Sequence, residues 1–265
     1  MIDKHDRETW LRGGDALCAT LPPPPPHIYR LILLGAPGVG KGTQAQLLGQ
    51  RLGACHLSTG DVFRAAKALP KEQISPAMRT ALGAMSRGEL VQDETVLDMV
   101  RERSRCLRCR GGFLLDGFPR TVVQAEALDN LLKWERRALT AVVNYDLPTD
   151  VIVSRLSGRR TCPGCKAVYH ETSRPPKTAG VCDTCGGKLY QREDDRPESI
   201  AVRLEAYRRS TAPLIQFYKN LGLLVSVAAT GSPDEICDRT IAALESAVAA
   251  RSRQNGHRHR INAPV

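Results

Sequence analysis

Long hydrophobic runs are missing from this 265-residue chain, since no apolar stretch reaches the roughly 18 residues that a membrane span needs. The first residues also lack the apolar segment of a secretory signal, and they carry the acidic residues Asp3, Asp6, Glu8 and Asp15. Mitochondrial targeting segments are poor in acids, so this composition argues against import as well. We expect a cytoplasmic protein that does not bind membranes.

Acidic residues are outnumbered, with 28 Asp and Glu against 38 Lys and Arg, which gives a net charge of +10. Such a surplus favours partners that carry phosphate, whether nucleotides, nucleic acid or anionic lipid, and does not choose among them. Residues 251–265 hold four arginines and no acid, so we expect a disordered basic tail there. Five consecutive prolines at 22–26 are typical of an extended spacer, and we predict that residues 1–28 form a disordered leader.

Short apolar runs bounded by Gly or Pro predict the buried strands of a parallel sheet. They lie at 28–34, 112–116, 141–146 and 223–228. Helical patterns follow the first three runs, and this alternation predicts a three-layer α/β/α fold with ligands at the carboxyl ends of the strands. Two stretches break the alternation: short helices from about 58 to 90, and a segment rich in Cys, Pro, Gly and Lys from about 158 to 195. We expect both to be insertions.

A glycine-rich loop, Gly35-Ala-Pro-Gly-Val-Gly-Lys-Gly-Thr43, follows the first predicted strand and opens a helix. This is the setting of a P-loop, whose backbone N–H groups surround phosphate oxygens while Lys41 reaches the β and γ phosphates. Gly42 stands where a Ser or Thr hydroxyl commonly binds Mg²⁺, which argues against direct hydroxyl ligation. Asp116 ends the second predicted strand like a Walker B carboxylate, and we expect it to reach Mg²⁺ through water.

The loop resembles that of the nucleoside monophosphate kinases, and of the adenylate kinase family in particular. Further blocks agree with that family in order and spacing: Ser58-Thr-Gly-Asp-Val-Phe-Arg64, Phe113-Leu-Leu-Asp-Gly-Phe-Pro-Arg-Thr121 with Gln124, Arg155 with Gly158-Arg159-Arg160, and Asp194-Asp195 followed by Arg203. The match covers about residues 29–245. It implies a P-loop NTPase domain at 29–250, with core segments 29–57, 92–157 and 196–250, an NMP-binding insertion at 58–91 and a lid at 158–195.

The resemblance also implies which residues contact each nucleotide. Those expected to bind ATP are Gly38, Val39, Gly40, Lys41, Gly42, Thr43, Arg155, Tyr169 and Gly231. Those expected to bind AMP are Thr59, Arg64, Glu89, Val91, Gly117, Arg120, Gln124, Arg192 and Arg203. Those expected to support the transfer itself are Lys41, Asp116, Arg120, Arg155, Arg159, Arg192 and Arg203. Arginine suits this task because its planar fork binds phosphate oxygens bidentately and stays charged when desolvated.

Four cysteines in the predicted lid, Cys162, Cys165, Cys182 and Cys185, have the spacing Cys-x₂-Cys-x₁₆-Cys-x₂-Cys. This spacing is typical of a tetrahedral zinc site, and four thiolates leave no open position for catalysis. We expect one structural zinc ion that stabilises a segment without a hydrophobic core. Lids of zinc-containing adenylate kinases, which this segment resembles, carry such cysteines.

The resemblance thus implies an enzyme that converts Mg·ATP and AMP to two ADP, and we expect it to be a monomer that binds no nucleic acid. Within the family, Thr in the Ser-Thr-Gly-Asp block goes with AMP, and the side-chain amide of Gln124 can hydrogen-bond an adenine edge. Two alternatives stay open: a GTP:AMP phosphotransferase, because backbone contacts near Gly231 discriminate the donor base weakly, and a zinc-ribbon nucleic-acid-binding ATPase, because of the net positive charge.

Overall fold

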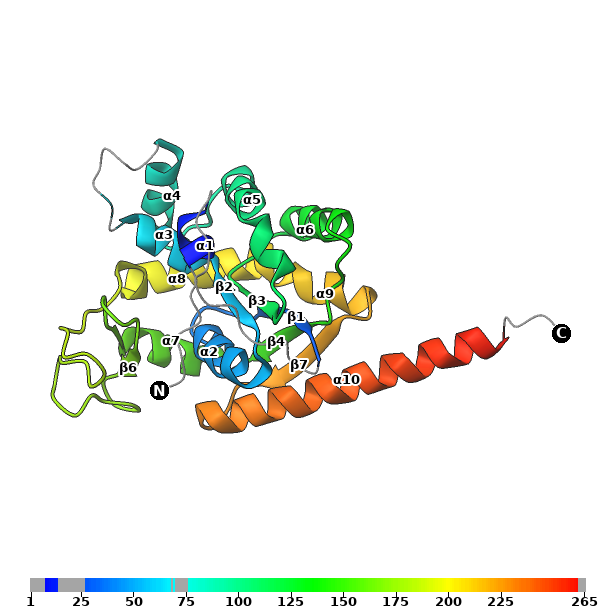
Figure 1. Ribbon diagram of the computed structural model, residues 1–265. Coiled ribbons are helices and arrows are strands. Elements are labelled where there is room, and N and C mark those ends of the chain that lie inside the picture. The colour runs from blue at the N-terminus through cyan, green and yellow to red at the C-terminus, as the bar shows by residue number, and fades with distance from the viewer. Residues whose placement is uncertain (1–7, 14–26, 68, 70–75, 262–265) are drawn as a thin grey trace.

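The computed structural model describes residues 8–13, 27–67, 69 and 76–261 (Figure 1). The strands are β1 (Tyr29–Leu34), β2 (Cys55–Ser58), β3 (Gly112–Asp116), β4 (Ala141–Asp146), β5 (Arg159–Thr161), β6 (Val168–His170) and β7 (Leu224–Ala228). The α-helices are α1 (Glu8–Arg12), α2 (Lys41–Leu52), α3 (Thr59–Lys67), α4 (Pro76–Arg87), α5 (Asp93–Glu102), α6 (Val122–Trp134), α7 (Thr149–Ser157), α8 (Pro197–Ala206), α9 (Pro213–Asn220) and α10 (Pro233–Ile261). Short turns of other helical types are η2 (Ser104–Arg108), η3 (Glu193–Asp195) and η4 (Tyr207–Thr211).

The central sheet has five strands in the order β2-β3-β1-β4-β7, and every neighbouring pair is parallel. Strand β1 lies in the middle, where Leu33 pairs with Asp116 of β3 on one side and with Val143 of β4 on the other. The loop that follows β1 therefore opens next to the end of β3. The predicted three-layer α/β fold with a parallel sheet is confirmed, whereas the four-residue strand β2 was not among the predicted strands.

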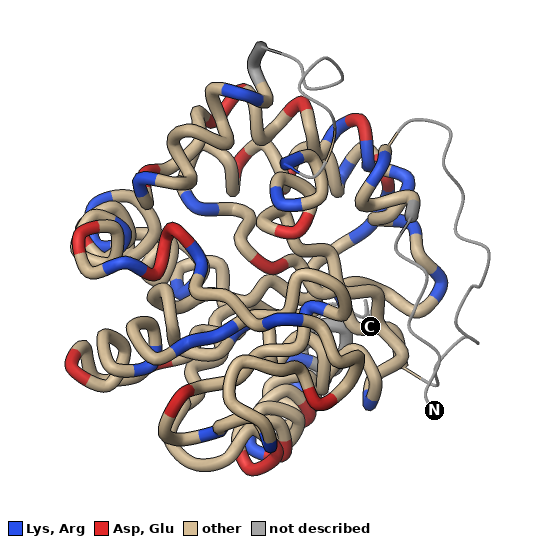
Figure 2. Tube along the Cα trace, turned by 90° about the vertical axis from the view of Figure 1, so that its left-hand side faces the viewer, with Lys and Arg blue, Asp and Glu red and all other residues tan. Residues whose placement is uncertain are grey.

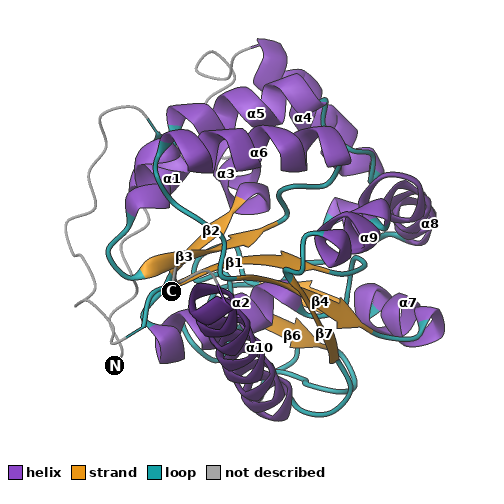
Figure 3. Cartoon of the chain, turned by 90° about the vertical axis from the view of Figure 1, so that its right-hand side faces the viewer, coloured by secondary structure: helices purple, strands orange, loops and turns teal. Residues whose placement is uncertain are grey.

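Alternating side chains of the strands form two separate cores. Leu31 and Leu33 belong to the buried cluster shared with α2, α7, α8 and α10, while Ile32 and Leu34 belong to the cluster shared with α3, α5, α6 and α9. Figure 3 shows α2 and α10 below the sheet and α5 and α6 above it. Because both faces are covered, the strands read as continuous apolar runs, which is why they could be recognised in the sequence.

Both stretches that interrupt the alternation form small units beside the sheet. Helices α3 and α4 lie in the stretch 58–91, and the antiparallel pair β5–β6 lies in the stretch 158–195 (Figure 1). The lid segment has its own small buried cluster, which contains Tyr169 and Leu189 beside two of the cysteines. The division into core, NMP-binding insertion and lid stays a prediction.

The two ends of the chain differ from expectation. Residues 8–12 of the predicted leader form α1, and the side chain of Trp10 is 1% exposed within the core above the sheet, so the folded part begins before residue 29. Burial of the indole removes a large apolar surface from water, and this stabilises the helix although the residues around it in the sequence are mostly polar. Helix α10 continues through residues 251–261, where we expected disorder. The five prolines at 22–26 lie outside the described residues.

Among the described residues, no helix combines the length and the apolar character needed to cross a bilayer.

Candidate active site

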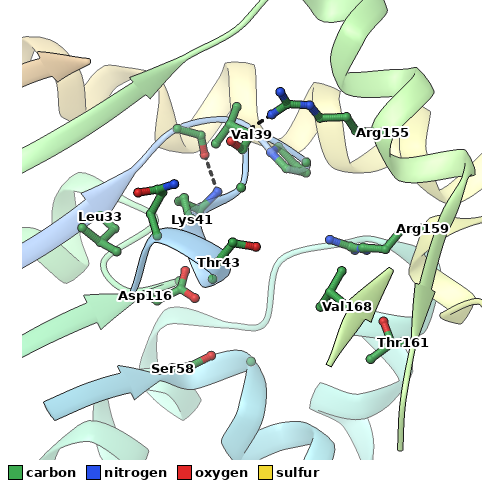
Figure 4. A pocket seen from close by; sticks show the side chains of 18 of the residues that line it. Leu33, Val39, Lys41, Thr43, Ser58, Asp116, Arg155, Arg159, Thr161 and Val168 are labelled. Carbon is green, nitrogen blue, oxygen red and sulfur yellow. Dashed lines mark hydrogen bonds between the residues drawn. The ribbon is translucent and has the colours of Figure 1, made fainter. Parts of the chain in front are cut away.

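The loop between β1 and α2 closes around the side chain of Lys41. The Lys41 ammonium donates to the carbonyl oxygen of Gly35 at 2.7 Å (Figure 4) and to that of Ala36 at 3.0 Å. Gly38 and Gly40 have φ angles of 88° and 101°, which residues with a Cβ rarely adopt. Burial lowers the pKa of Lys41 to about 8, and nearby arginines act in the same direction against Asp116. A phosphate group at this loop would therefore stabilise the protonated lysine.

Asp116 lies directly beside the loop. A Cβ atom on Gly42 would stand 3.6 Å from Asp116 Oδ2, so the position that commonly carries a hydroxyl faces this carboxylate. Burial acts to raise the pKa of Asp116, but the hydrogen bond and charge of His56 and the charge of Lys41 outweigh it, and the pKa is lowered. The carboxylate is thus held in its charged form at the end of β3, as a residue that assists a cation must be.

A single cavity of about 1330 Å³ gathers the predicted cationic residues. They come from separate elements: Arg64 from α3, Arg120 from the loop after β3, Arg155 from α7, Arg159 from β5, Arg192 from the loop before η3 and Arg203 from α8. Figure 4 shows Arg159 pointing toward the P-loop from the lid side of the cavity. Figure 2 faces the left-hand side of Figure 1 and shows basic residues of several segments there, interspersed with acidic ones. Six guanidinium groups around one space fit a ligand with several phosphates.

Two neighbouring carboxylates hold part of this cluster in place. Asp195, which is fully buried, accepts hydrogen bonds from Arg159 Nε at 2.7 Å and from Arg203 Nη1 at 2.9 Å. Arg203 Nη1 also lies 3.1 Å from Asp194 Oδ2. Burial acts to raise the pKa of Asp194, but Arg203 and Arg159 outweigh it and lower the pKa. Both arginines are therefore held by the buried Asp195 carboxylate, and Arg203 also by the partly exposed Asp194.

The remaining guanidinium groups crowd one another. Burial, followed by the charges of Arg159 and Arg64, lowers the pKa of Arg192 to about 10. Burial and the charge of Arg203 also lower the pKa of Arg120, which donates through Nε to the Gly117 carbonyl at 2.9 Å. Like charges this close destabilise the protonated forms of Arg192 and Arg120, and a bound anion would offset that repulsion. The charge of the cavity therefore favours the binding of phosphate.

The four lid cysteines converge on one point, with their sulfur atoms all within 4.8 Å of one another. Each Cys-x₂-Cys pair forms the same turn: the Cys162 amide donates to the Ala167 carbonyl, and the Cys182 amide donates to the Gly187 carbonyl, both at 2.9 Å. The residues after the two pairs, Lys166 and Gly186, both have a positive φ, of 64° and 70°. Two matching turns that aim four thiols at one point fit a metal ion with four sulfur ligands.

Comparison with known proteins decides the class of the enzyme. The adenylate kinase family model matches residues 33–223, which is most of the chain. The chain belongs to the adenylate kinase family. As the sequence predicts, it is a nucleoside monophosphate kinase, a phosphotransferase.

Curated relatives from several bacteria carry the name adenylate kinase. One from Thermodesulfovibrio yellowstonii is 50% identical over 216 residues, which is 82% of this chain and 99% of the relative. One from Caldicellulosiruptor saccharolyticus is 48% identical, over 80% of this chain and 95% of the relative. One from Streptomyces coelicolor is 48% identical, over 82% and 98%. These relatives favour the AMP-dependent phosphotransferase over a nucleic-acid-binding ATPase.

Four residues assigned to AMP by the adenylate kinase resemblance do not line the cavity as the structure stands: Thr59, Glu89, Val91 and Gln124. The Gln124 side chain is 2% exposed, accepts from the Arg120 amide at 2.7 Å and donates to Asp93 at 2.7 Å. One donor hydrogen and one acceptor position of its amide are thus used within the protein, and the side chain would have to become exposed before it could contact a base. Thr59 is buried next to Gly117, where a Cβ atom would stand 2.9 Å from the Thr59 hydroxyl oxygen.

Tyr169 and Gly231, which the resemblance assigns to ATP, both line the cavity. The Tyr169 hydroxyl accepts from the Asp183 amide at 2.9 Å and lies 3.5 Å from Cys182 Sγ, which links the predicted ATP contact to the cysteine cluster. Arg155 donates to the Ala229 carbonyl at 3.2 Å and so joins α7 to the loop that carries Gly231.

His56 is a site residue that sequence reasoning missed. Its Nε2 lies 3.3 Å from Asp116 Oδ2, and both residues line the cavity. The two are 60 positions apart and meet only because β2 pairs with β3, so the sequence offered no local signal. In this cavity the imidazole lies against one oxygen of the Asp116 carboxylate, which is close to the P-loop.

Proposed function

We propose that this chain catalyses reversible phosphoryl transfer between Mg·ATP and AMP in a direct in-line reaction, giving two ADP. An oxygen of the AMP phosphate attacks the γ-phosphorus of ATP, and the bond from that phosphorus to its bridging oxygen breaks, so that the leaving group is ADP. No protein nucleophile is needed. The convergence of six arginines and Lys41 on one cavity carries this proposal.

The two nucleotides would meet at the P-loop. Lys41 and the loop amides 38–43 would hold the ATP phosphates, with Arg155, Tyr169 and Gly231 toward the donor nucleoside. Arg64, Arg120 and Arg192 would hold the AMP phosphate, and Gly117 would leave room for it. Thr59, Glu89, Val91 and Gln124 would complete the AMP side once the insertion has closed over the nucleotide.

Charge stabilisation of the transferred group would come from guanidinium groups already in position. Arg159 and Arg203 are held by Asp195, so little reorganisation is needed when charge develops on the phosphoryl oxygens. Magnesium, which the donor nucleotide brings, neutralises charge on the β and γ phosphates. Asp116, charged and opposite Gly42, would orient it through water.

The lid would exclude water and hold one zinc ion through Cys162, Cys165, Cys182 and Cys185. Bound there, zinc would tie the two turns of the lid together. Its role would be structural, since four thiolates would leave no ligand position for substrate. We further propose a monomer in the cytoplasm that does not bind nucleic acid.

A coupled assay tests the proposal. ATP and GTP are crossed as donors with AMP, UMP, CMP and GMP as acceptors, and ADP formation is measured at constant Mg²⁺. We expect ATP with AMP to give the highest kcat/KM. A higher kcat/KM with GTP would favour the GTP:AMP phosphotransferase, and no AMP-dependent ADP formation would refute the proposal.

A further inference from the structure

Helix α1 places a buried tryptophan against the AMP side of the cavity. Trp10 is 1% exposed and belongs to the same buried cluster as Leu57, Val62 and Phe63, which flank the junction of β2 and α3. Its indole Nε1 donates to the Ser58 carbonyl oxygen at 2.9 Å. Helix α1 precedes the stretch 33–223 that the family model matches, and no role described so far uses it. In Figure 1, α1 lies beside α3.

Arg103 fixes α1 at the end of α5. Its side chain, 6% exposed, donates to the carbonyl oxygens of Trp10 at 2.7 Å, Met99 at 3.1 Å and Arg12 at 3.2 Å. Gly13 has a φ of 71°, and a Cβ atom there would stand 2.8 Å from the Arg103 guanidinium group. The contact between α1 and the core is therefore close-packed and specific in its hydrogen bonds.

Ser58, the partner of Trp10, begins a chain of contacts that leads into the cavity. It ends β2 and lines the cavity, and Thr59 follows it as the first residue of α3. The Ser58 hydroxyl accepts from the Asp61 amide at 3.3 Å, and the Asp61 carboxylate accepts from Arg64 Nη2 at 2.7 Å. Burial acts to lower the pKa of Arg64, but the charge and hydrogen bond of Asp61 outweigh it and raise the pKa, so the ion pair stabilises the charged guanidinium group.

We propose that Trp10 is a positioning residue for AMP binding, which acts by fixing the Ser58 carbonyl and with it the start of α3. Arg64, which lines the cavity, then keeps its orientation toward the incoming phosphate, and Thr59 keeps its buried position as the first residue of α3. The inference rests on the proposed function, because both residues are AMP contacts there. The inference assigns to the acceptor site a segment, α1, that lies outside the region matched by the family model.

Steady-state kinetics of Trp10→Phe test this inference, because that variant keeps an aromatic ring in the core and removes the N–H donor. We expect the KM for AMP to rise about fivefold, in line with one lost hydrogen bond, with kcat and the KM for ATP within twofold. The matched control is Trp134→Phe, since Trp134 is 74% exposed at the end of α6. All constants of that control should stay within twofold of the unmodified chain.

The reciprocal effect gives a second readout that does not depend on the stability of the Trp10 variant. If Trp10 affects AMP affinity, AMP changes the free-energy cost of substituting Trp10 by the same amount, because coupling between two sites is mutual. Since the indole bonds the Ser58 carbonyl at the start of α3, we expect AMP binding to alter its surroundings. In the Trp134→Phe protein Trp10 is the sole tryptophan, and its fluorescence should change on titration with AMP and not with ATP alone.

Three results would overturn the inference: an unchanged KM for AMP in Trp10→Phe with only a lower melting temperature, an equal rise of both KM values, or a Trp10 fluorescence that AMP does not change. Failure of the proposed function looks different, because the unmodified chain would then form no ADP from ATP and AMP, and the inference would fall with it.

Discussion

Lys41 illustrates how a single residue is prepared for its ligand. Without nucleotide, its ammonium is satisfied by the two loop carbonyls of Gly35 and Ala36, and burial among arginines keeps its pKa near 8. Lys41, which binds phosphate in its protonated form, therefore titrates near pH 8 in the free protein. Nucleotide binding should raise the pKa of Lys41.

This predicts a pH dependence of donor binding. Because the pKa is lowered from 10.5 to about 8, the lysine loses its proton in the free enzyme above about pH 8. We expect log kcat/KM for Mg·ATP to fall above that pH with a slope of about −1, since kcat/KM reports groups of the free enzyme. Lys41→Arg should lack this fall, because arginine stays protonated. Circular dichroism at each pH checks folding, and a flat profile of the unmodified chain up to pH 10 would contradict the assignment.

Asp195 is the second residue whose role can be measured directly. Asp195→Asn keeps the shape of the side chain but removes the buried negative charge that holds Arg159 and Arg203. We expect a loss of about 3 to 5 kcal/mol in the free energy of unfolding, as for other broken buried pairs, together with a lower kcat. Urea unfolding and the coupled assay give the two values.

The control for this change is Glu205→Gln on α8, since Glu205 is more than half exposed and pairs only loosely with Arg208 and Arg209. That substitution should alter stability by less than about 1 kcal/mol. Equal stability of the two variants would show that the buried carboxylate contributes nothing specific.

At the scale of elements, the lid depends on its cysteines more than on apolar packing. Its buried cluster contains few large side chains beyond Tyr169 and Leu189. Zinc bound by four thiolates can contribute about 10 kcal/mol or more to the folding of such a segment. We therefore expect one zinc per chain by metal analysis, and loss of that zinc with a lower melting temperature in Cys182→Ser.

Cys237→Ala is the matched control for metal content, because Cys237 is buried in α10, outside the lid. It should retain the metal. Removal of zinc with a chelator should reproduce the effect of Cys182→Ser on the unmodified chain. Full zinc content in Cys182→Ser would contradict a four-cysteine site.

Elements also show where sequence reasoning succeeds and fails. Strands β1, β3 and β4 were predicted because burial on both faces makes them largely apolar. Strand β7 at the sheet edge was predicted from its Leu and Val residues, although buried and exposed positions alternate along it. Strand β2 was missed because it is only four residues long and contains Cys55 and His56, both partly exposed. Helix α1 was missed because only tertiary contacts, chiefly those of Trp10 and Arg103, stabilise five residues in a polar segment.

At the scale of the whole molecule, the cavity is built where units from distant parts of the chain meet. The Arg set was predicted by resemblance, and the structure brings all six to one cavity, although their individual roles stay predictions. Lys67 on α3 already contacts Glu193 of η3 at 2.7 Å, which connects the two insertions across the opening. What the sequence could not supply is the arrangement of the acceptor side, because Gln124 and Thr59 depend on contacts with Asp93 and Asp116.

A ligand that spans both nucleotide positions should therefore affect the entire structure. Two adenosines joined through five phosphates should raise the melting temperature more than ATP or AMP alone, because one molecule would engage all the arginines. Small-angle X-ray scattering should show a smaller radius of gyration as the lid and α3–α4 approach each other. Calorimetry gives the affinity. Binding no tighter than that of ATP would contradict a cavity with two nucleotide sites.

The docking of α1 has a consequence for how this enzyme is made. The indole of Trp10 bonds to a residue 48 positions later in the chain, and the carbonyl of Trp10 bonds to Arg103, 93 positions later. At about 5 to 20 residues per second, the ribosome adds Arg103 roughly 5 to 20 seconds after Trp10. Helix α1 is thus synthesised before the residues that bind it, so the Trp10 side chain cannot be buried in its site until Arg103 and the residues around Ser58 have been made.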